Sequence, residues 1–285
     1  MAVVVGVDIG GSGVRAAAVS SAGELGEIRR VALIHRGVDA VIDAVRAVSL
    51  DLGATAVGVG VPGFVRDGRV VASPNFPEWS DIPLAKRLSA ALGCPVHVEN
   101  DANAAAFGVY VARGRRRDVL VLTLGTGVGG GIVTGGRLFR GSGGTGAELG
   151  HVRVGGNRAC GCGGRGCLEM WVGTVGLVAA AAERGFAVRD GAAVVAAADA
   201  GENWALSVMS DAAEALGLGL ASLTNLFNPE EIVLCGGLSG AQRHLAQAEV
   251  VWRAEGIRAN TEDVSIVWEG RADAFAIAGA AWSSS

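Results

Sequence analysis

The most distinctive chemistry in this sequence is a cluster of cysteines. Cys160, Cys162 and Cys167 fall within eight positions, and His151 precedes the first of them by nine residues. One imidazole and three thiolates are enough for a closed tetrahedral zinc site, and the intervening glycines allow the tight backbone path that such a site needs. We therefore predict a structural zinc ion held by these four residues. The alternative is a set of buried free thiols on a glycine-rich loop.

Two carboxylates bracket the predicted zinc loop. Glu148 lies three residues before His151, and Glu169 lies two residues after Cys167. Paired carboxylates accept hydrogen bonds from vicinal hydroxyls, and the second ring nitrogen of His151 also needs a partner. Either glutamate alone would be interpreted as a solvent-exposed loop residue. Together they favour a sugar site built around the metal.

A third group of polar residues follows an apolar run at 94–98. Asn100 and Asp101 come next and open a helical stretch. An aspartate at a helix start is commonly a cap, but the end of a buried strand is also where ligands bind in α/β sheets. There Asp101 could accept the proton of a hydroxyl that attacks a phosphoryl group. Asn75, in a proline-framed loop, either reaches the same cleft or forms a turn.

The chain contains an internal repeat of a strand, a glycine turn and a second strand, at 6–19 and again at 122–133. Glycine turns let backbone N–H groups converge on an anion. Neither turn is a Walker A loop or a Rossmann turn, because no Gly-Lys-Ser/Thr follows and the next element is strand-like. We predict that both turns bind phosphate, through Asp8, Gly10, Gly11, Ser12 and Gly13 in the first and Gly125, Thr126 and Gly127 in the second.

Short apolar runs alternate with longer helical patterns along the whole chain. The runs at 3–7, 57–61, 119–124 and 231–234 predict buried strands, and the patterns at 38–52, 82–92, 102–112, 205–227 and 241–254 predict helices. This alternation indicates an α/β architecture with largely parallel sheets. The length of 285 residues suits two lobes around a cleft.

Composition argues against several classes of partner. The net charge is -4 and there is a single lysine, Lys86, so neither nucleic acid nor an anionic membrane is favoured. The basic run at 113–117 reads as a solvated loop. No apolar run reaches the length of a membrane span, and the N-terminus lacks the features of a secretory signal. We expect a soluble cytoplasmic protein with reduced cysteines.

These motifs together resemble the ROK family of sugar kinases. The resemblance spans nearly the whole chain, and its cysteine motif is highly specific. The matching segments are residues 8–12, 99–103, 124–131, 148–151, 160–169 and 235–237. The resemblance implies an actin-like ATPase (ribonuclease H-like) α/β fold. Its N-terminal lobe would comprise 1–108, completed by a C-terminal helix at 272–285, and the second lobe, with the zinc loop, would comprise 109–271.

The resemblance also implies roles for single residues. Asp101 would be the catalytic base, the hairpin glycines with Gly236 and Gly237 would lie against ATP, and Asp8 would help position Mg²⁺. The residues that would touch the sugar are Asn75, Asn100, Asp101, Glu148, His151 and Glu169. The implied reaction transfers a phosphoryl group from ATP to the 6-hydroxyl of a hexose, glucose above all, and the family expectation is a homodimer or a higher homo-oligomer.

Some features depart from the family pattern. The first hairpin reads Gly11-Ser12-Gly13-Val14-Arg15, where many members have Thr-Lys after the two glycines, and this version is similar to polyphosphate-using glucokinases. Those relatives usually lack the cysteine cluster, so ATP is favoured over polyphosphate. N-acetylglucosamine, mannose or fructose would need nearly the same contacts as glucose. A non-catalytic sugar-binding regulator is the alternative of a different class, and it would not need Asp101.

Overall fold

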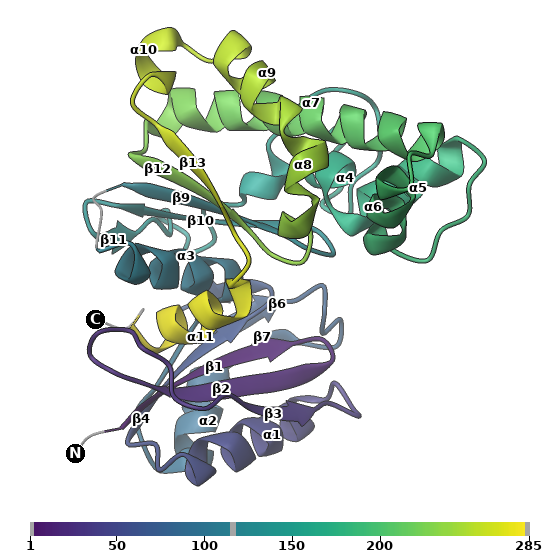
Figure 1. Cartoon of the computed structure of the whole chain (residues 1–285). Helices are drawn as coiled ribbons and strands as arrows, with labels where there is room; N and C mark the ends of the chain where they lie inside the picture. The colour runs from purple at the N-terminus through teal and green to yellow at the C-terminus, as the bar shows by residue number, and fades with distance from the viewer. Residues whose placement is uncertain (1–2, 115–117, 283–285) are drawn as a thin grey trace. The chain divides into compact units, whose positions relative to one another are not determined.

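The computed structural model describes residues 3–114 and 118–282 (Figure 1). The predicted loop at 113–117 and the predicted helix at 272–285 therefore lie partly outside the described residues. The chain divides into two compact units. The first unit comprises Met1–Arg117, Gly131–Ala147 and Arg271–Ser285, and the second comprises Asp118–Gly130 and Glu148–Gly270.

The first unit is built on a five-stranded mixed sheet. Its strands are β1 (Val4–Gly10), β2 (Gly13–Val19), β3 (Arg29–Ala32), β4 (Ala56–Val61) and β8 (Val96–Asn100), in the order β3-β2-β1-β4-β8. β1, β2 and β3 form an antiparallel meander, and β4 and β8 continue the sheet in parallel with β1. The middle strands β1 and β4 are buried along almost their whole length because helices cover both faces of the sheet.

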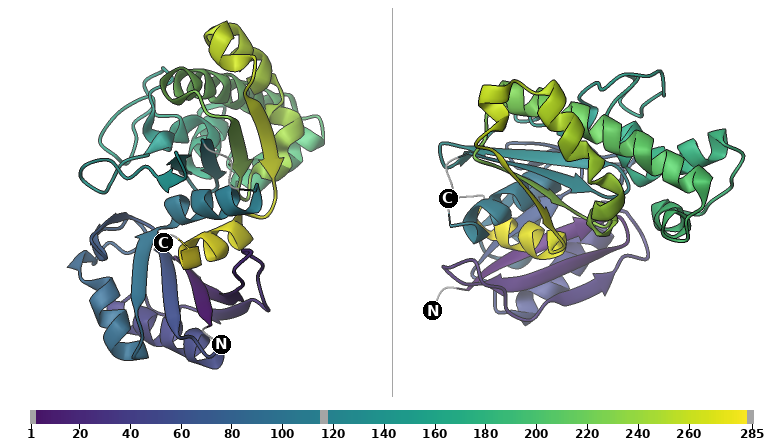
Figure 2. Two further views of the ribbon diagram at one scale, coloured as in Figure 1. Left: turned by 90° about the vertical axis from the view of Figure 1, so that its left-hand side faces the viewer. Right: turned by 45° about the horizontal axis from the view of Figure 1, so that its top comes forward.

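Four helices belong to this sheet. They are α1 (Val38–Asp51), α2 (Leu84–Leu92), α3 (Asp101–Ala112) and α11 (Ala272–Trp282). α1 and α2 pack on one face, and α11 packs on the other beside α3 (Figure 2). α11 approaches the sheet closely because Gly6 and Gly58 have no side chain, and a Cβ at either position would collide with a carbonyl oxygen of α11. The last helix in the sequence is thus part of the first unit's core.

A small antiparallel sheet also belongs to the first unit. It contains β5 (Phe64–Arg66), β6 (Arg69–Ala72) and β7 (Ser80–Ile82). Phe76 and Trp79, in the loop between β6 and β7, stack with their ring centroids 4.4 Å apart and are buried. This packing anchors the loop that carries Asn75.

The second five-stranded sheet repeats the order of the first. Its strands are β9 (Val119–Leu124), β10 (Val128–Thr134), β11 (Arg137–Leu138), β12 (Glu231–Cys235) and β13 (Ser265–Glu269), in the order β11-β10-β9-β12-β13. β12 is parallel to both β9 and β13, whereas β10 and β11 are antiparallel. The boundary between the two units falls within β10. The internal repeat predicted from the glycine turns is therefore confirmed at the level of the sheets.

The remaining helical segments belong to the second unit. They are η1 (Leu149–His151), α4 (Glu169–Val172), α5 (Thr174–Glu183), α6 (Gly191–Asp199), α7 (Asn203–Phe227), η2 (Ser239–Ala241), α8 (Gln242–Leu245), α9 (Gln247–Glu255) and α10 (Arg258–Thr261). α7 is long and apolar enough to cross a membrane by length and composition alone, but 61% of its apolar window is buried inside the protein. It packs along α9, and the indole of Trp252 donates a hydrogen bond to Thr224. α7 thus has the packing of a core helix.

Two predicted helices differ from the structure. The helix expected at 82–92 begins at Leu84, because Ile82 ends β7 and Pro83 intervenes. The single helix expected at 241–254 is divided into η2, α8 and α9. Ala246, between α8 and α9, retains helical backbone angles, so the segment keeps one helical path with an interrupted hydrogen-bond pattern.

Candidate active site and metal centre

The first predicted phosphate turn is a tight hairpin between β1 and β2. Gly10 pairs with Gly13, so only Gly11 and Ser12 form the turn. A Cβ at Gly11 would lie 3.4 Å from the side-chain nitrogen of Asn75, which places the Asn75 amide next to the turn. Asn75 and the first turn are therefore neighbours within the first unit.

Asp8 lies on β1, two residues before Gly10, and is buried. The guanidinium of Arg15, directly across the strand pair, donates a 2.5 Å hydrogen bond to its carboxylate and also pairs with Asp273 at the start of α11. Burial raises the pKa of Asp8, and the charge of Arg15 opposes this rise. Arg15 thus helps to keep a buried carboxylate ionised beside the turn.

Asn100 and Asp101 lie where β8 ends and α3 begins. Asn100 is the N-cap of α3: its side-chain oxygen accepts hydrogen bonds from the backbone N–H of Ala102 (2.9 Å) and Asn103 (3.0 Å). The capping role considered for Asp101 therefore belongs to Asn100. Asp101 is the first residue of the helix, and its Oδ1 accepts a 2.9 Å hydrogen bond from the N–H of Ala102, which orients the carboxylate.

Glu99 precedes these two residues and was not predicted to have a role. It is 3% exposed, and its carboxylate accepts hydrogen bonds from the N–H of Asn100, the amide of Asn103 and the guanidinium of Arg140. Burial alone would raise its pKa, but the neighbouring His97, the charge of Arg140 and the hydrogen bonds lower the pKa of Glu99 to about 2 from a usual 4.5.

This lowered pKa predicts an acid dependence of stability. A carboxylate whose pKa is lower in the folded than in the unfolded state stabilises the fold fully above its unfolded pKa, and this stabilisation is lost as the pH falls from 4.5 toward 2. We expect Glu99 to account for about 3 kcal/mol of this loss. Denaturant unfolding at several pH values should show a shallower acid decline for Glu99→Gln than for the wild type. Parallel declines would contradict the prediction.

The second predicted phosphate turn connects β9 to β10. The N–H of Gly125 donates a 2.9 Å hydrogen bond to the carbonyl of Gly127. The first residues of α5 are tied to the same turn, since the N–H of Thr174 donates to Gly125 and that of Val175 donates to Thr126. The turn is thus held rigidly against the start of a helix.

Gly236 and Gly237 follow β12 and lie beside this second turn. Gly236 has a φ of 108°, and a Cβ there would collide with the carbonyl oxygen of Leu124 at the end of β9. That carbonyl also accepts a 3.0 Å hydrogen bond from the N–H of Leu238. The structure therefore brings together two of the three glycine segments predicted to contact the nucleotide, and both belong to the second unit.

The four predicted zinc ligands form one cluster in the second unit. Their ligand atoms all lie within 4.8 Å of one another. The thiols of Cys162 and Cys167 are 3.7 Å apart, and the Cys160 sulfur lies 3.5 Å from Nδ1 of His151. Ligands in a tetrahedral zinc site are about 3.8 Å apart, given Zn–S distances of about 2.3 Å. The cluster fits a zinc ion bound through Nδ1 of His151, which leaves Nε2 for another partner.

The backbone around the cluster is preorganised. Residues 153 and 167 form a β-bridge, as do residues 159 and 165, and the N–H of Cys160 donates to the carbonyl of Gly164. Gly163 and Gly166 have positive φ values of 84° and 70°, which side chains rarely tolerate. Gly163 and Gly166 are thus required by the path of the loop.

The two predicted sugar-binding glutamates lie beside the metal cluster. Glu169 begins α4; its Oε2 accepts a 3.1 Å hydrogen bond from the N–H of Val128, and its Oε1 lies 3.7 Å from the Cys160 sulfur. Burial raises the pKa of Glu148, while the charge of His151 opposes this and the charge of Glu169 adds to it. Within the second unit, Glu148, His151 and Glu169 therefore lie close enough to act on one ligand.

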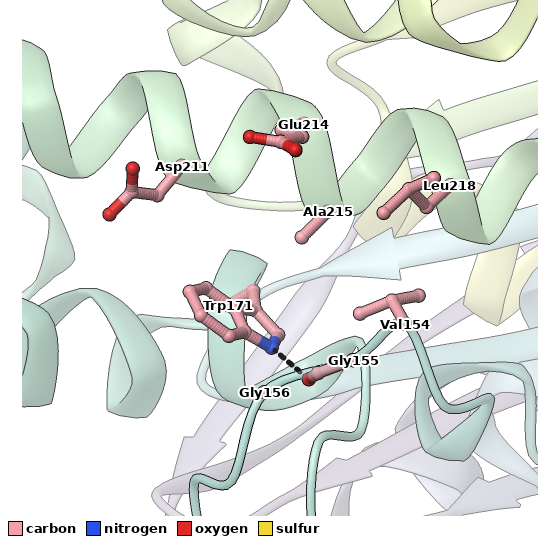
Figure 3. Close-up of a pocket in the computed structure, with 8 residues that line it drawn as sticks. All are labelled: Val154, Gly155, Gly156, Trp171, Asp211, Glu214, Ala215 and Leu218. Atoms are coloured by element: carbon pink, nitrogen blue, oxygen red, sulfur yellow. Dashed lines mark hydrogen bonds between the residues drawn. The ribbon is translucent and has the colours of Figure 1, made fainter.

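The second unit also has a surface pocket that holds none of the predicted site residues (Figure 3). It has a volume of about 300 Å³ and is bordered by α7, by the segment 154–156 and by Trp171. The Trp171 indole donates a 3.3 Å hydrogen bond to the carbonyl of Gly155. Trp171 lies two residues after Glu169 on α4, so this pocket and the candidate sugar site share one short helix.

The predicted site residues are divided between the two units. Asp8, the first glycine turn, Asn75, Asn100 and Asp101 belong to the first unit. The second glycine turn, Gly236, Gly237, Glu148, Glu169 and the Cys/His cluster belong to the second. Each unit therefore carries one phosphate-type turn together with polar groups suited to a hydroxylated ligand.

Comparisons with known proteins identify the family of this chain. The sequence pattern of the ROK family matches residues 4–283. The glucokinase of Streptomyces coelicolor is 38% identical over 264 residues, which cover 84% of this chain and 83% of the relative. A ROK family glucokinase from Streptomyces griseus, solved in complex with glucose and AMPPNP, is 34% identical, with a TM-score of 0.81 and 98% of each chain covered. The ROK hexokinase of Thermus thermophilus is 33% identical, with a TM-score of 0.84 and coverage of 99% and 97%.

The repeated sheet order, with a glycine hairpin opening each sheet, is that of the actin-like ATPase class, as the sequence predicted. Within this class, the chain belongs to the ROK family.

Proposed function

We infer that this protein is an ATP-dependent sugar kinase that phosphorylates glucose at its 6-hydroxyl. The observation that carries this inference is the similarity over 98% of the chain to a ROK glucokinase that binds glucose and an ATP analogue. The curated glucokinases, 36–38% identical over 83–84% of this chain, support the same activity. The oriented carboxylate of Asp101 at the start of α3 supplies the group that such a reaction needs.

Asp101 is the proposed general base. As the new bond forms between the sugar O6 and the γ-phosphorus, the bond from that phosphorus to the leaving ADP oxygen breaks, and the proton of the 6-hydroxyl passes to the Asp101 carboxylate. The transition state is loose, so the protein contributes mainly positioning, and proton transfer comes late. Because Asn100 supplies the cap of α3, the Asp101 carboxylate is not required for capping.

The sugar hydroxyls are proposed to bind residues from both units. Those of the first unit are Asn75 and Asn100, and those of the second are Glu148, His151 and Glu169. Amide and carboxylate groups in fixed positions reject sugars whose hydroxyls are missing, because the protein groups would then be left unpaired. The Nε2 atom of His151 is proposed to contact the sugar, since Nδ1 faces the cysteine cluster.

The donor phosphates are proposed to bind the backbone of the two glycine turns and of Gly236 and Gly237. Asp8 would hold Mg²⁺, which when bound neutralises charge on the phosphates. The Cys/His cluster would hold zinc with no open position, so its role is to fix the sugar loop. Assembly into a homodimer stays a prediction.

The proposed function is tested by ADP release with Mg·ATP and a panel of glucose, N-acetylglucosamine, mannose, fructose and N-acetylmannosamine. We expect the highest kcat/KM with glucose. Polyphosphate should be offered as an alternative donor, scored by formation of sugar phosphate, since faster turnover with it would reassign the donor. Turnover of another hexose above glucose would reassign the acceptor. No turnover with any pair, from protein that contains zinc, would favour the sugar-binding regulator.

A further inference from the structure

Arg140 closes a glycine-rich loop that leads directly to Glu148. The carbonyl of Arg140 accepts a 2.9 Å hydrogen bond from the N–H of Gly146, so the two ends of the loop meet at this residue. Ala147 follows with a φ of 67°, a left-handed conformation that is unfavourable for a residue other than glycine. Such a conformation persists only where the surrounding structure imposes it. The backbone immediately before Glu148 therefore has a fixed conformation.

The side chain of the same Arg140 is anchored on Glu99. Its Nε donates a 2.7 Å hydrogen bond to Oε2 of Glu99, whose side chain is 4% exposed. Farther along the loop, the carbonyl of Gly143 accepts a 2.7 Å hydrogen bond from Arg66 on β5. Both contacts hold the loop within the first unit, and Arg140, which makes one of them, is also the residue whose carbonyl closes the loop.

The other oxygen of Glu99 organises the start of α3. Oε1 accepts 3.0 Å hydrogen bonds from the N–H of Asn100 and from Nδ2 of Asn103. Asn100 in turn caps the helix on which Asp101 is the first residue. One oxygen of the buried Glu99 carboxylate therefore contacts the start of the helix that carries the proposed base. The other oxygen contacts Arg140, the residue that closes the loop before Glu148.

We propose that Glu99, through Arg140, is a positioning residue that sets the sugar-binding groups for phosphoryl transfer. Neither residue needs to touch the sugar. Glu99 holds Asn100 directly and Asp101 through the helix start that Asn100 caps, and Arg140 fixes the point at which the chain leaves for Glu148. This inference rests on the proposed function, because it assigns the pair to the sugar-binding half of that reaction.

The test uses substitutions that separate the two oxygens. Glu99→Gln keeps an oxygen for Asn100 and Asn103 but presents an amide N–H₂ group to Arg140, so it breaks the tie to the loop. Arg140→Met removes the same hydrogen bond by removing the donor. Arg140→Lys keeps a positive charge at this position but lacks the planar guanidinium group. The matched control is Asp81→Asn, which breaks an exposed Arg69–Asp81 ion pair of the same 2.7 Å length in the same unit.

We expect Glu99→Gln and Arg140→Met each to lower kcat/KM for glucose about 10- to 100-fold, because small misplacements of catalytic groups are costly. KM for ATP should change less than twofold, and Arg140→Lys should recover part of the loss. The kcat/KM of the double variant for glucose should be no lower than that of the poorer single variant, since both substitutions remove the same hydrogen bond. Asp81→Asn should match the wild type.

Three results would overturn the inference. The first is a wild-type kcat/KM for glucose in folded Glu99→Gln. The others are equal rises in KM for glucose and for ATP, and additive losses of kcat/KM in the double variant. Thermal unfolding of each variant identifies losses that come only from a smaller folded fraction. The proposed function is judged separately, on wild-type turnover: an inactive wild type that does not bind glucose by calorimetry would overturn both, whereas an active wild type with unaffected variants would overturn this inference alone.

Discussion

Replacing Asp101 by asparagine is expected to lower kcat for glucose about a hundred- to ten-thousandfold, with little change in KM. A positioned general base contributes about 10²- to 10⁴-fold to such reactions, and asparagine cannot accept the proton of the 6-hydroxyl. The fold should survive, because Asn100 and not Asp101 caps α3. Steady-state kinetics with ADP release would measure the effect, and circular dichroism would confirm that the variant is folded.

The control for this variant is Asp43→Asn, which makes the same chemical change on the exposed face of α1 in the same unit. It should leave both kcat and KM unchanged. If folded Asp101→Asn kept a kcat within tenfold of the wild type, another group would have to accept the proton, and the assignment of Asp101 would be wrong.

Loss of the metal cluster should have the second largest effect, and it should mainly weaken the binding of glucose. Cys162→Ala, or treatment of the wild type with a strong chelator, removes the constraint that holds Glu148, His151 and Glu169 together. Ordering a released loop costs about 2–5 kcal/mol at each binding event. We therefore expect KM for glucose to rise about 100-fold, while KM for ATP changes less than tenfold. Metal analysis should show one zinc per wild-type chain and a loss of this zinc in the variant.

Cys94→Ala is the matched control, because Cys94 is a free cysteine of the first unit and lies outside the cluster. It should keep its zinc and its activity. Equal losses of glucose and ATP affinity in Cys162→Ala would point to unfolding of the whole unit. Full activity of a zinc-free protein would show that the loop is ordered by its own hydrogen bonds.

The strands and the metal ligands could be predicted from sequence because their signals are local. The four predicted strands are β1, β4, β9 and β12, each a short run of β-branched or aliphatic residues that ends near a glycine or a polar residue. Cys160, Cys162 and Cys167 fall within eight positions, so their convergence follows from the tight glycine turns between them. The proposed sugar and nucleotide roles came partly from residue chemistry, as for the two glycine turns and the paired glutamates, and partly from a family resemblance, and they stay predictions.

Other features had no local signal. α5 and α6 are rich in alanine and valine without a clear polar face, so they show little helical periodicity. The cap of α3 was missed by one residue, since Asn100 and Asp101 are both good caps and boundary positions are the least certain part of a pattern. The contact between Glu99 and Arg140 joins residues 41 positions apart, and only the folded chain shows that they meet.

The place of α11 in the sequence bears on how the chain is made. The strands β1 and β4 leave the ribosome before every segment of the second unit, yet the helix that fills the space above Gly6 and Gly58 leaves it after all of them. Domains commonly fold as they emerge, with the N-terminal one first. Here the sheet of the first unit lacks one of its covering helices until α11 is made, whereas the segments of the second unit have all been synthesised by Gly270. A helix made after the whole second unit therefore completes the core of strands made before it.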